Sequence, residues 1–162
     1  MPALESGAQP LVIEPGNVIL QHGHVFVQVR RGELTESFLR RLAPNFRSLR
    51  IAWRNQPVGV LAILEEGAPM PKPALLQQQR EFVQSMSRDL ALTQAFVVLG
   101  ESLSASLLRS ALRMMSIRRG DRRICGSVEE GASFLEPHVA SPSAKELVTT
   151  VAYARRLLET TA

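Results

Sequence analysis

The run Val58-Gly59-Val60-Leu61-Ala62-Ile63-Leu64 is the longest uninterrupted apolar stretch in this chain of 162 residues. Gln56-Pro57 precedes it, and residues 65–73, which contain three prolines and a glycine, follow it. A strand-length run that is apolar at every position is typical of a strand buried on both faces, as in a sheet covered by helices. It therefore predicts the central strand of an α/β protein. It is far shorter than the ~18 residues that cross a bilayer, so we expect no membrane helix.

Two β-prone runs lie upstream of this strand, at residues 18–21 and 25–29, with His22-Gly23-His24 between them. A glycine between two such runs predicts a β-hairpin. Thr35 then offers an N-cap for an amphipathic helix. Because proline removes a backbone donor, we expect Pro44 to end or kink this helix, with a second helical stretch over residues 45–53.

Helices and strands alternate downstream of the central strand. Pro73 suits the first turn of a helix, and residues 95–99 form the next strand. Ser102 or Ser104 can cap the helix that follows. The apolar side chains of that helix predict one stripe facing the sheet, which contains Leu103, Leu107, Leu108, Ala111, Leu112 and Met115.

The last third of the chain predicts a weak strand at residues 123–126 and two more helices. Ser127 and Glu130 match a capping box, in which each side chain bonds the other residue's backbone N–H. A break at residues 140–143 precedes a final helix with one apolar side. That side must be covered by the sheet of its own chain or by a second molecule; the short connection favours its own chain.

This order of elements predicts an α/β fold. We expect a mixed, largely parallel sheet with an N-terminal hairpin and helices packed on it, plus an extra C-terminal helix. The chain divides into a flexible leader (1–15), one domain (16–139) and the C-terminal helix (140–162).

Composition limits the function classes. Hydrophobic residues make up 45% and charged residues 21%, as in ordinary globular domains. The N-terminus does not match a secretory signal and the single Cys125 excludes an internal disulfide, so we expect a cytoplasmic protein. The net charge is +4, and all but two of the 19 basic residues are arginine.

The arginines do not suggest a nucleic-acid binder, because they are scattered and aromatic residues make up only 5% of the chain. Their one dense group follows a predicted helix, where positive charge complements the helix dipole. It comprises Arg118, Arg119, Arg122 and Arg123.

Four segments resemble one known family. Residues 27–35 (VQVRRGELT) form a strand-to-helix step, and residues 123–135 (RICGSVEEGASFL) join a short strand to a capped helix. With residues 64–69 and 98–101, they resemble STAS domains of the SpoIIAA-like, anti-sigma-factor antagonist group over about residues 18–137. The resemblance implies a SpoIIAA-like sandwich and a regulatory protein-protein interaction. Its motifs concern packing and capping, so they speak for fold more than for function.

One turn departs from that family. STAS domains that switch partners usually carry a phosphorylatable serine or threonine after the central strand, whereas residues 65–71 (EEGAPMP) contain no hydroxyl. Phosphorylation at this turn is therefore not expected. A glutamate there either mimics the phosphorylated state or is simply solvated, and we favour the second because exposed acidic loops are common.

The segment Gly100-Glu101-Ser102-Leu103-Ser104 is the best catalytic candidate. It follows a strand and opens a helix, as in the nucleophile elbow G-x-S-x-G, and Asp121 and His138 follow in hydrolase order. Ser104 replaces the final glycine, however, and capping alone explains Ser102. The same loop is a milder candidate for binding an anion through Gly100, Ser102 and Ser104, although Glu101 would repel it.

Three further features have ordinary structural interpretations. His22 and His24 could share a metal, but no third ligand stands at a suitable spacing. Cys125 fits a small buried residue better than a nucleophile. Trp53 fits the edge of a core, although it could anchor an interface.

We therefore expect a non-enzymatic protein-interaction module without cofactor or metal, whose partner is another protein or a second copy of the chain. The candidate contact residues are Glu65, Glu66, Pro69, Trp53, Arg109 and Arg113. The alternative is a protein of the same fold that carries a small ligand or lipid, which would need a pocket of some hundreds of Å³ between sheet and helices. The third hypothesis is a serine hydrolase that uses Ser102.

Overall fold

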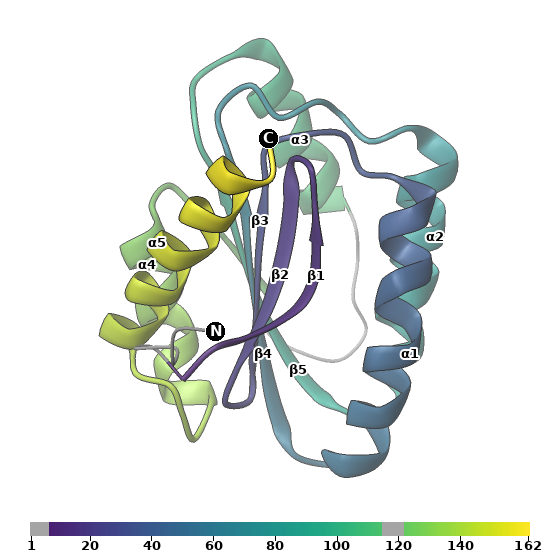
Figure 1. Cartoon of the computed structure of the whole chain (residues 1–162), viewed down its shortest axis with the longest axis vertical. Helices are drawn as coiled ribbons and strands as arrows, with labels where there is room; N and C mark the ends of the chain where they lie inside the picture. Colours follow the sequence, from purple (N-terminus) through teal and green to yellow (C-terminus); the bar gives the residue numbers. More distant parts are fainter. Residues whose placement is uncertain (1–6, 115–121) are drawn as a thin grey trace.

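A computed structural model describes residues 7–114 and 122–162 (Figure 1). These residues form one six-stranded sheet in the order β1-β2-β3-β4-β5-β6. The strands are β1 (Gln9–Glu14), β2 (Asn17–His22), β3 (Val25–Arg30), β4 (Pro57–Leu64), β5 (Ala91–Val98) and β6 (Arg122–Cys125). The helices are α1 (Glu36–Ala52), α2 (Pro73–Met86), α3 (Leu103–Met114), α4 (Val128–Leu135) and α5 (Ala144–Thr160), with a 3-10 turn at Glu136–His138.

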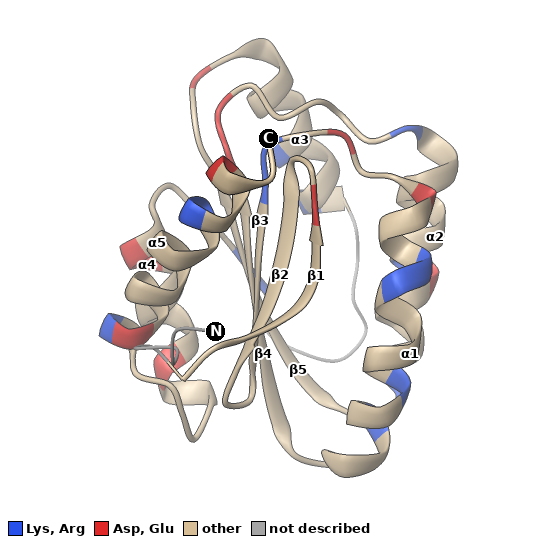
Figure 2. Cartoon of the chain, viewed as in Figure 1, with Lys and Arg blue, Asp and Glu red and all other residues tan. Residues whose placement is uncertain are grey.

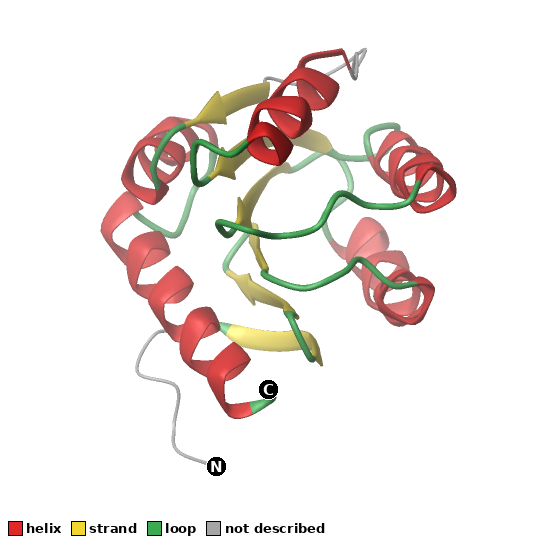
Figure 3. Cartoon of the chain, turned by 90° about the horizontal axis from the view of Figure 1, so that it is seen from above, coloured by secondary structure: helices red, strands yellow, loops and turns green. Residues whose placement is uncertain are grey.

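The sheet is antiparallel from β1 to β3 and parallel from β3 to β6. Parallel strands that follow one another in order, joined by crossovers of one hand, place all their connecting helices on the same face. Accordingly, α1, α2 and α3 cover one face, and α4 and α5 cover the other (Figures 1 and 3). The expected α/β architecture is confirmed.

The central strand is β4, as its sequence predicts, with β3 and β5 as its neighbours. Leu61 and Ile63 belong to the core under α4 and α5, whereas Val58 belongs to the core under α1 and α2. All three are fully buried. Alternate side chains of one strand thus enter two different cores, which is why the run is apolar throughout.

The predicted hairpin is present between β2 and β3, with Gly23 at a φ of 55° in its turn. The predicted leader is wrong for residues 9–14. They form the edge strand β1, which pairs with β2 and buries Val12. Its β-prone run, Leu11-Val12-Ile13, is only three residues long, and its pairing with β2 completes the strand.

Helix α1 is continuous and contains Pro44. The prediction that the proline divides this segment into two helices is therefore wrong. Leu42 and Phe46, on either side of the proline, are buried, whereas Pro44 itself is exposed. Burial of that face holds the helix together, and solvent can satisfy the carbonyl that loses its donor. Thr35 is the N-cap, as expected: its Oγ1 accepts a hydrogen bond from the backbone N–H of Phe38 at 3.0 Å.

The predicted capping box of α4 is half right. Ser127 accepts from the backbone N–H of Glu130 at 3.1 Å. The carboxylate of Glu130, however, accepts from the backbone N–H of Gly126 at 2.9 Å. A complete capping box stands instead at α5, between Ser143 and Glu146.

Helix α5 packs on its own chain, on the face of β2 and β3 that α4 leaves uncovered. Its inward residues are buried, namely Leu147, Thr150, Val151, Ala154 and Leu158. None of the helices in the described ranges is both long and apolar enough to span a membrane.

Candidate functional site

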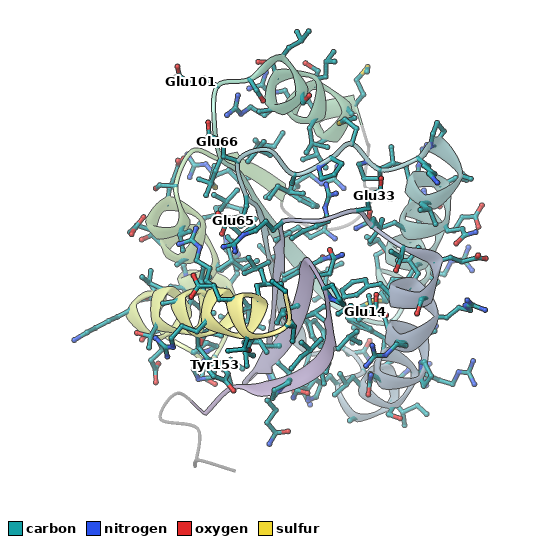
Figure 4. The ribbon with its side chains drawn as sticks, turned by 45° about the horizontal axis from the view of Figure 1, so that its top comes forward. Glu14, Glu33, Glu65, Glu66, Glu101 and Tyr153 are labelled. Carbon is teal, nitrogen blue, oxygen red and sulfur yellow. The ribbon has the colours of Figure 1, made fainter. Side chains whose placement is uncertain are left out.

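The loops that leave the carboxyl ends of β4 and β5 hold three of the acidic residues singled out from the sequence. Figure 4 shows Glu65, Glu66 and Glu101 at this end of the sheet. Glu65 forms an ion pair with Arg155 of α5, with 2.5 Å between Oε1 and Nε. Glu66 is exposed and lies against Gly100, whose φ of +90° and close contact with Glu66 Cγ leave no space for a side chain. Glu65 is therefore used within the chain, whereas Glu66 remains accessible.

The candidate anion site lies in the loop before α3 and in the first turn of that helix. Ser102 Oγ accepts from the backbone N–H of Ala105 at 3.1 Å, so it caps the helix. Ser104 is exposed. Arg109 donates to the carbonyl oxygens of Val98, at 3.0 Å, and Gly100. This guanidinium ties α3 to the end of β5.

The hydrolase triad is not assembled around Ser102. His138 lines a hollow with Asn55, Pro57 and Ala91, at the amino ends of β4 and β5, whereas Ser102 follows the carboxyl end of β5. The two residues thus lie at opposite ends of the parallel strands. Asp121, the third candidate, lies outside the described residues, as do Arg118 and Arg119.

The six contact candidates do not form one surface. Trp53 is half-buried, and its ring centroid lies 4.7 Å from that of His24 and 5.6 Å from that of Phe26. It belongs to the core edge at the amino end of β4. Pro69 is exposed near the opposite end, where its carbonyl accepts from Arg30 at 2.7 Å. Arg113 is exposed on α3.

Helix α3 has two apolar sides, which the sequence prediction merged into one. Ala105, Leu108 and Leu112 face the sheet and are buried. On the opposite side Leu103, Leu107 and Met114 have exposed fractions of 77%, 55% and 80%. The sequence reveals the apolar residues of α3, but only the packing shows that the sheet covers one of the two sides on which they lie. The prediction of one stripe that includes Leu103 and Leu107 is therefore wrong, and Met115, its last member, lies outside the described residues.

A cavity of about 60 Å³ lies between α2 and α3, above the sheet. Its apolar walls include Leu76 of α2, Leu108 and Leu112 of α3, and Phe96 of β5. Its polar lining comes from Gln28, Arg30, Gln79, Gln94 and Arg122. A second cavity of about 60 Å³, between the sheet and helices α1 and α2, shares Gln28, Gln79 and Gln94 with it.

These polar residues reach one place because of the sheet's register. Gln28 pairs with Ala62 of β4, and Ala62 pairs with Phe96 of β5. Gln94, two positions before Phe96, points to the same face and pairs with Arg122 of β6. The small Ala62 lies between the long side chains and leaves the space open. No local signal in the sequence marks this cluster, since its members come from three strands and a helix.

A wider hollow is an open groove of about 570 Å³ at the amino ends of β4 and β5. Its lining includes Asp89, whose carboxylate accepts a hydrogen bond from Arg50 Nε at 2.9 Å. That hydrogen bond lowers the pKa of the Asp89 carboxyl.

The histidine and cysteine candidates have structural partners. No cluster of three or more metal-binding side chains is present in residues 7–114 and 122–162. Thr150 donates its hydroxyl proton to the carbonyl of Glu146, so it accepts from His22 Nδ1, 2.7 Å away. Cys125 is buried, and burial raises the pKa of its thiol, which disfavours the reactive thiolate.

Basic residues occur on helices on both sides of the sheet. Figure 2 shows them on α1 and on α5, which cover opposite faces. Comparison of the chain with protein-family models, with curated proteins and with solved structures finds no match.

Proposed function

We propose that this chain is a non-enzymatic protein-interaction module that acts through the outer face of α3. This outer face consists of Leu103, Leu107, Ser110 and Met114, and we propose that the same face of a second copy covers it. The observation that carries the proposal is the exposure of three large apolar side chains on one side of a single helix. A helix that is apolar on both sides is normally covered on both.

The spacing of the outer face suits another helix. Its residues follow at intervals of four, three and four, which is the spacing of the apolar seam in a coiled coil. In an antiparallel pair, Leu107 of one copy would lie opposite the small Ser110 of the other. Leu103 would lie opposite Met114. A large side chain thus meets a small one near the two-fold axis, as interdigitated packing requires.

The charges at the two ends of α3 favour the same orientation. Glu101 is exposed just before the helix, and Arg113 is exposed in its last turn. Antiparallel packing brings the acidic end of one copy near the basic end of the other, whereas parallel packing brings like charges together.

The contact is expected to be weak and reversible. A helix of 12 residues is about 18 Å long, and three large apolar side chains cover less than the ~800 Å² that each partner contributes to a stable interface. Reversible association of this kind suits a regulatory role. We place the protein in the cytoplasm as part of this proposal, because its single cysteine is buried and unpaired.

Sedimentation equilibrium over a wide range of protein concentrations tests the proposal. The wild-type chain should pass from monomer to dimer, and Leu107→Arg should remain a monomer, because it places two cations near the two-fold axis. Ile51→Arg is the matched control, since Ile51 is as exposed as Leu103 but lies on α1. It should associate like the wild type.

Two results would contradict the proposal: a wild-type chain that stays monomeric at every concentration, or a dimer that Ile51→Arg and Leu107→Arg weaken equally. The lipid-carrier alternative has little support among the described residues, because the two cavities between the sheet and helices α1, α2 and α3 measure about 60 Å³ each and a carrier needs several hundred.

A further inference from the structure

The cavity between α2 and α3 contains a buried cation, Arg30, that forms no ion pair within the described residues. Arg30 is only 3% exposed. Its Nη1 donates to the carbonyls of Gly32, at 3.3 Å, and Pro69, at 2.7 Å. It forms no ion pair with any carboxylate of residues 7–114 or 122–162, and its Nε and Nη2 donate to none of those residues. Burial also lowers the pKa of Arg30 to about 10.

The amide groups around this cation have unused donors. Gln94 is 2% exposed, and its Oε1 accepts from Arg122 at 3.3 Å, which leaves its Nε2 without an acceptor in the described part of the chain. Gln28 and Gln79 line the same cavity, and neither side chain makes a hydrogen bond within that part. Gln28 and Gln79 are partly buried. Amide and guanidinium donors that face a cavity and have no protein acceptor are available to a ligand placed there.

We infer that this cavity is a binding site for a small organic monoanion, a carboxylate on a short apolar body. Arg30 and the amides of Gln94 and Gln28 hold its oxygens. Two oxygens of a carboxylate match the fork of a guanidinium, and a charge-assisted hydrogen bond is about twice as strong as a neutral one. This inference is independent of the proposed α3 contact, because the site faces the sheet and the outer face of α3 points away from it.

The size and the lining of the cavity restrict the class of ligand further. A cavity of about 60 Å³ takes only a few non-hydrogen atoms, which excludes a long acyl chain. Leu76, Leu108 and Phe96 would enclose the body of the ligand, so it is apolar. Arg122 also lines the cavity, but its guanidinium already donates to the carbonyl of Leu112 and to Gln94 Oε1, so Arg30 is the cation that the single charge of the ligand would balance.

Calorimetric titration with butyrate tests this assignment, with butyramide as the neutral analogue of the same shape. Butyrate should bind to the wild-type chain, and butyramide should bind at least about tenfold more weakly. Arg30→Met should weaken butyrate binding by a similar factor. Arg109→Met is the matched control, because Arg109 also donates to two backbone carbonyls but does not line the cavity. It should bind as the wild type does.

Ala62→Val provides a second variant in case Arg30→Met does not fold. It adds two methyl groups to the cavity and removes no charge, so butyrate binding should be lost while the circular dichroism spectrum stays that of the wild type. Leu107→Arg should bind butyrate normally even if it abolishes the dimer.

Three results would overturn the inference. They are equal binding of butyrate and butyramide, equal loss in Arg30→Met and Arg109→Met, and tighter binding of inorganic phosphate than of butyrate.

Discussion

Glu65, directly after the central strand, forms an ion pair with Arg155 of α5, 90 residues later in the chain. The side chain of Glu65 is 15% exposed and that of Arg155 is 34% exposed. The turn that sequence analysis offered to a partner protein is thus tied to the C-terminal helix of its own chain. Of the acidic pair in that turn, only Glu66 is free to meet another molecule.

This ion pair should contribute measurably to stability, since it is less solvated than a fully exposed pair. A double-mutant cycle with Glu65→Gln and Arg155→Met should give a coupling free energy of about 1 kcal/mol in urea unfolding. The pair between Glu14 and Arg41, whose arginine is 52% exposed, is the control and should couple more weakly. Equal coupling in the two pairs would show that Glu65 does not anchor α5.

Burial of α5 predicts a large effect of truncating its inward side chains. Leu147 is fully buried against β2 and β3, so Leu147→Ala should lower the free energy of unfolding by about 2–5 kcal/mol. Leu103→Ala makes the same chemical change on the exposed side of α3 and should alter it by less than about 0.5 kcal/mol in dilute protein. Chemical denaturation measures both. Similar losses would mean that α5 is not part of the core.

The glycine in α4 sets how closely this helix approaches the sheet. A Cβ at Gly131 would lie 2.9 Å from Leu61 Cδ1 and 2.9 Å from Val97 Cγ2. Although alanine favours helices, Gly131→Ala should therefore destabilise the protein by about 1–3 kcal/mol through overpacking. Gly126→Ala, where the nearest atom is 3.8 Å from the added carbon, should change stability little. A Gly131→Ala variant as stable as the wild type would contradict this packing.

The contact between His22 and Thr150 predicts a pH dependence of stability. Burial lowers the pKa of His22 below its ordinary value of 6.5, and the nearby Glu146 carboxylate opposes this shift. The unfolded chain therefore binds more protons than the folded one just below pH 6.5, so the free energy of unfolding falls as pH falls through that region. His22→Gln should flatten this part of the curve.

The control for that pH dependence is His24→Gln, which removes a histidine whose ring lies tilted against that of Trp53, at an interplanar angle of 57°. Melting temperatures measured from neutral pH to about pH 5 should fall equally in the wild type and in His24→Gln. A slope unchanged in His22→Gln would assign the pH dependence to other groups.

Most of the architecture could be predicted from local patterns in the sequence. The apolar run of β4, the cap at Thr35 and the proline that opens α2 depend on neighbours in the chain, so they can be read without coordinates. β1 was missed because its β-prone run, Leu11-Val12-Ile13, is short and its pairing with β2 completes the strand. The effect of Pro44 was overestimated because Leu42 and Phe46 hold α1 in place by tertiary burial.

The candidate sites depended far more on tertiary structure. The apolar content of α3 is visible in the sequence, but which half stays exposed follows from the width of sheet beneath it. Arg30 and Gln94 are 64 positions apart, and nothing around either residue marks it as buried. Both side chains point to the same face of the sheet, and the register of its strands brings them to one cavity. Composition and periodicity thus determined the elements of this protein and their order, because hydrogen bonding and amphipathicity are local. Only packing decided which polar and apolar groups were left without partners, because that depends on what every other element covers.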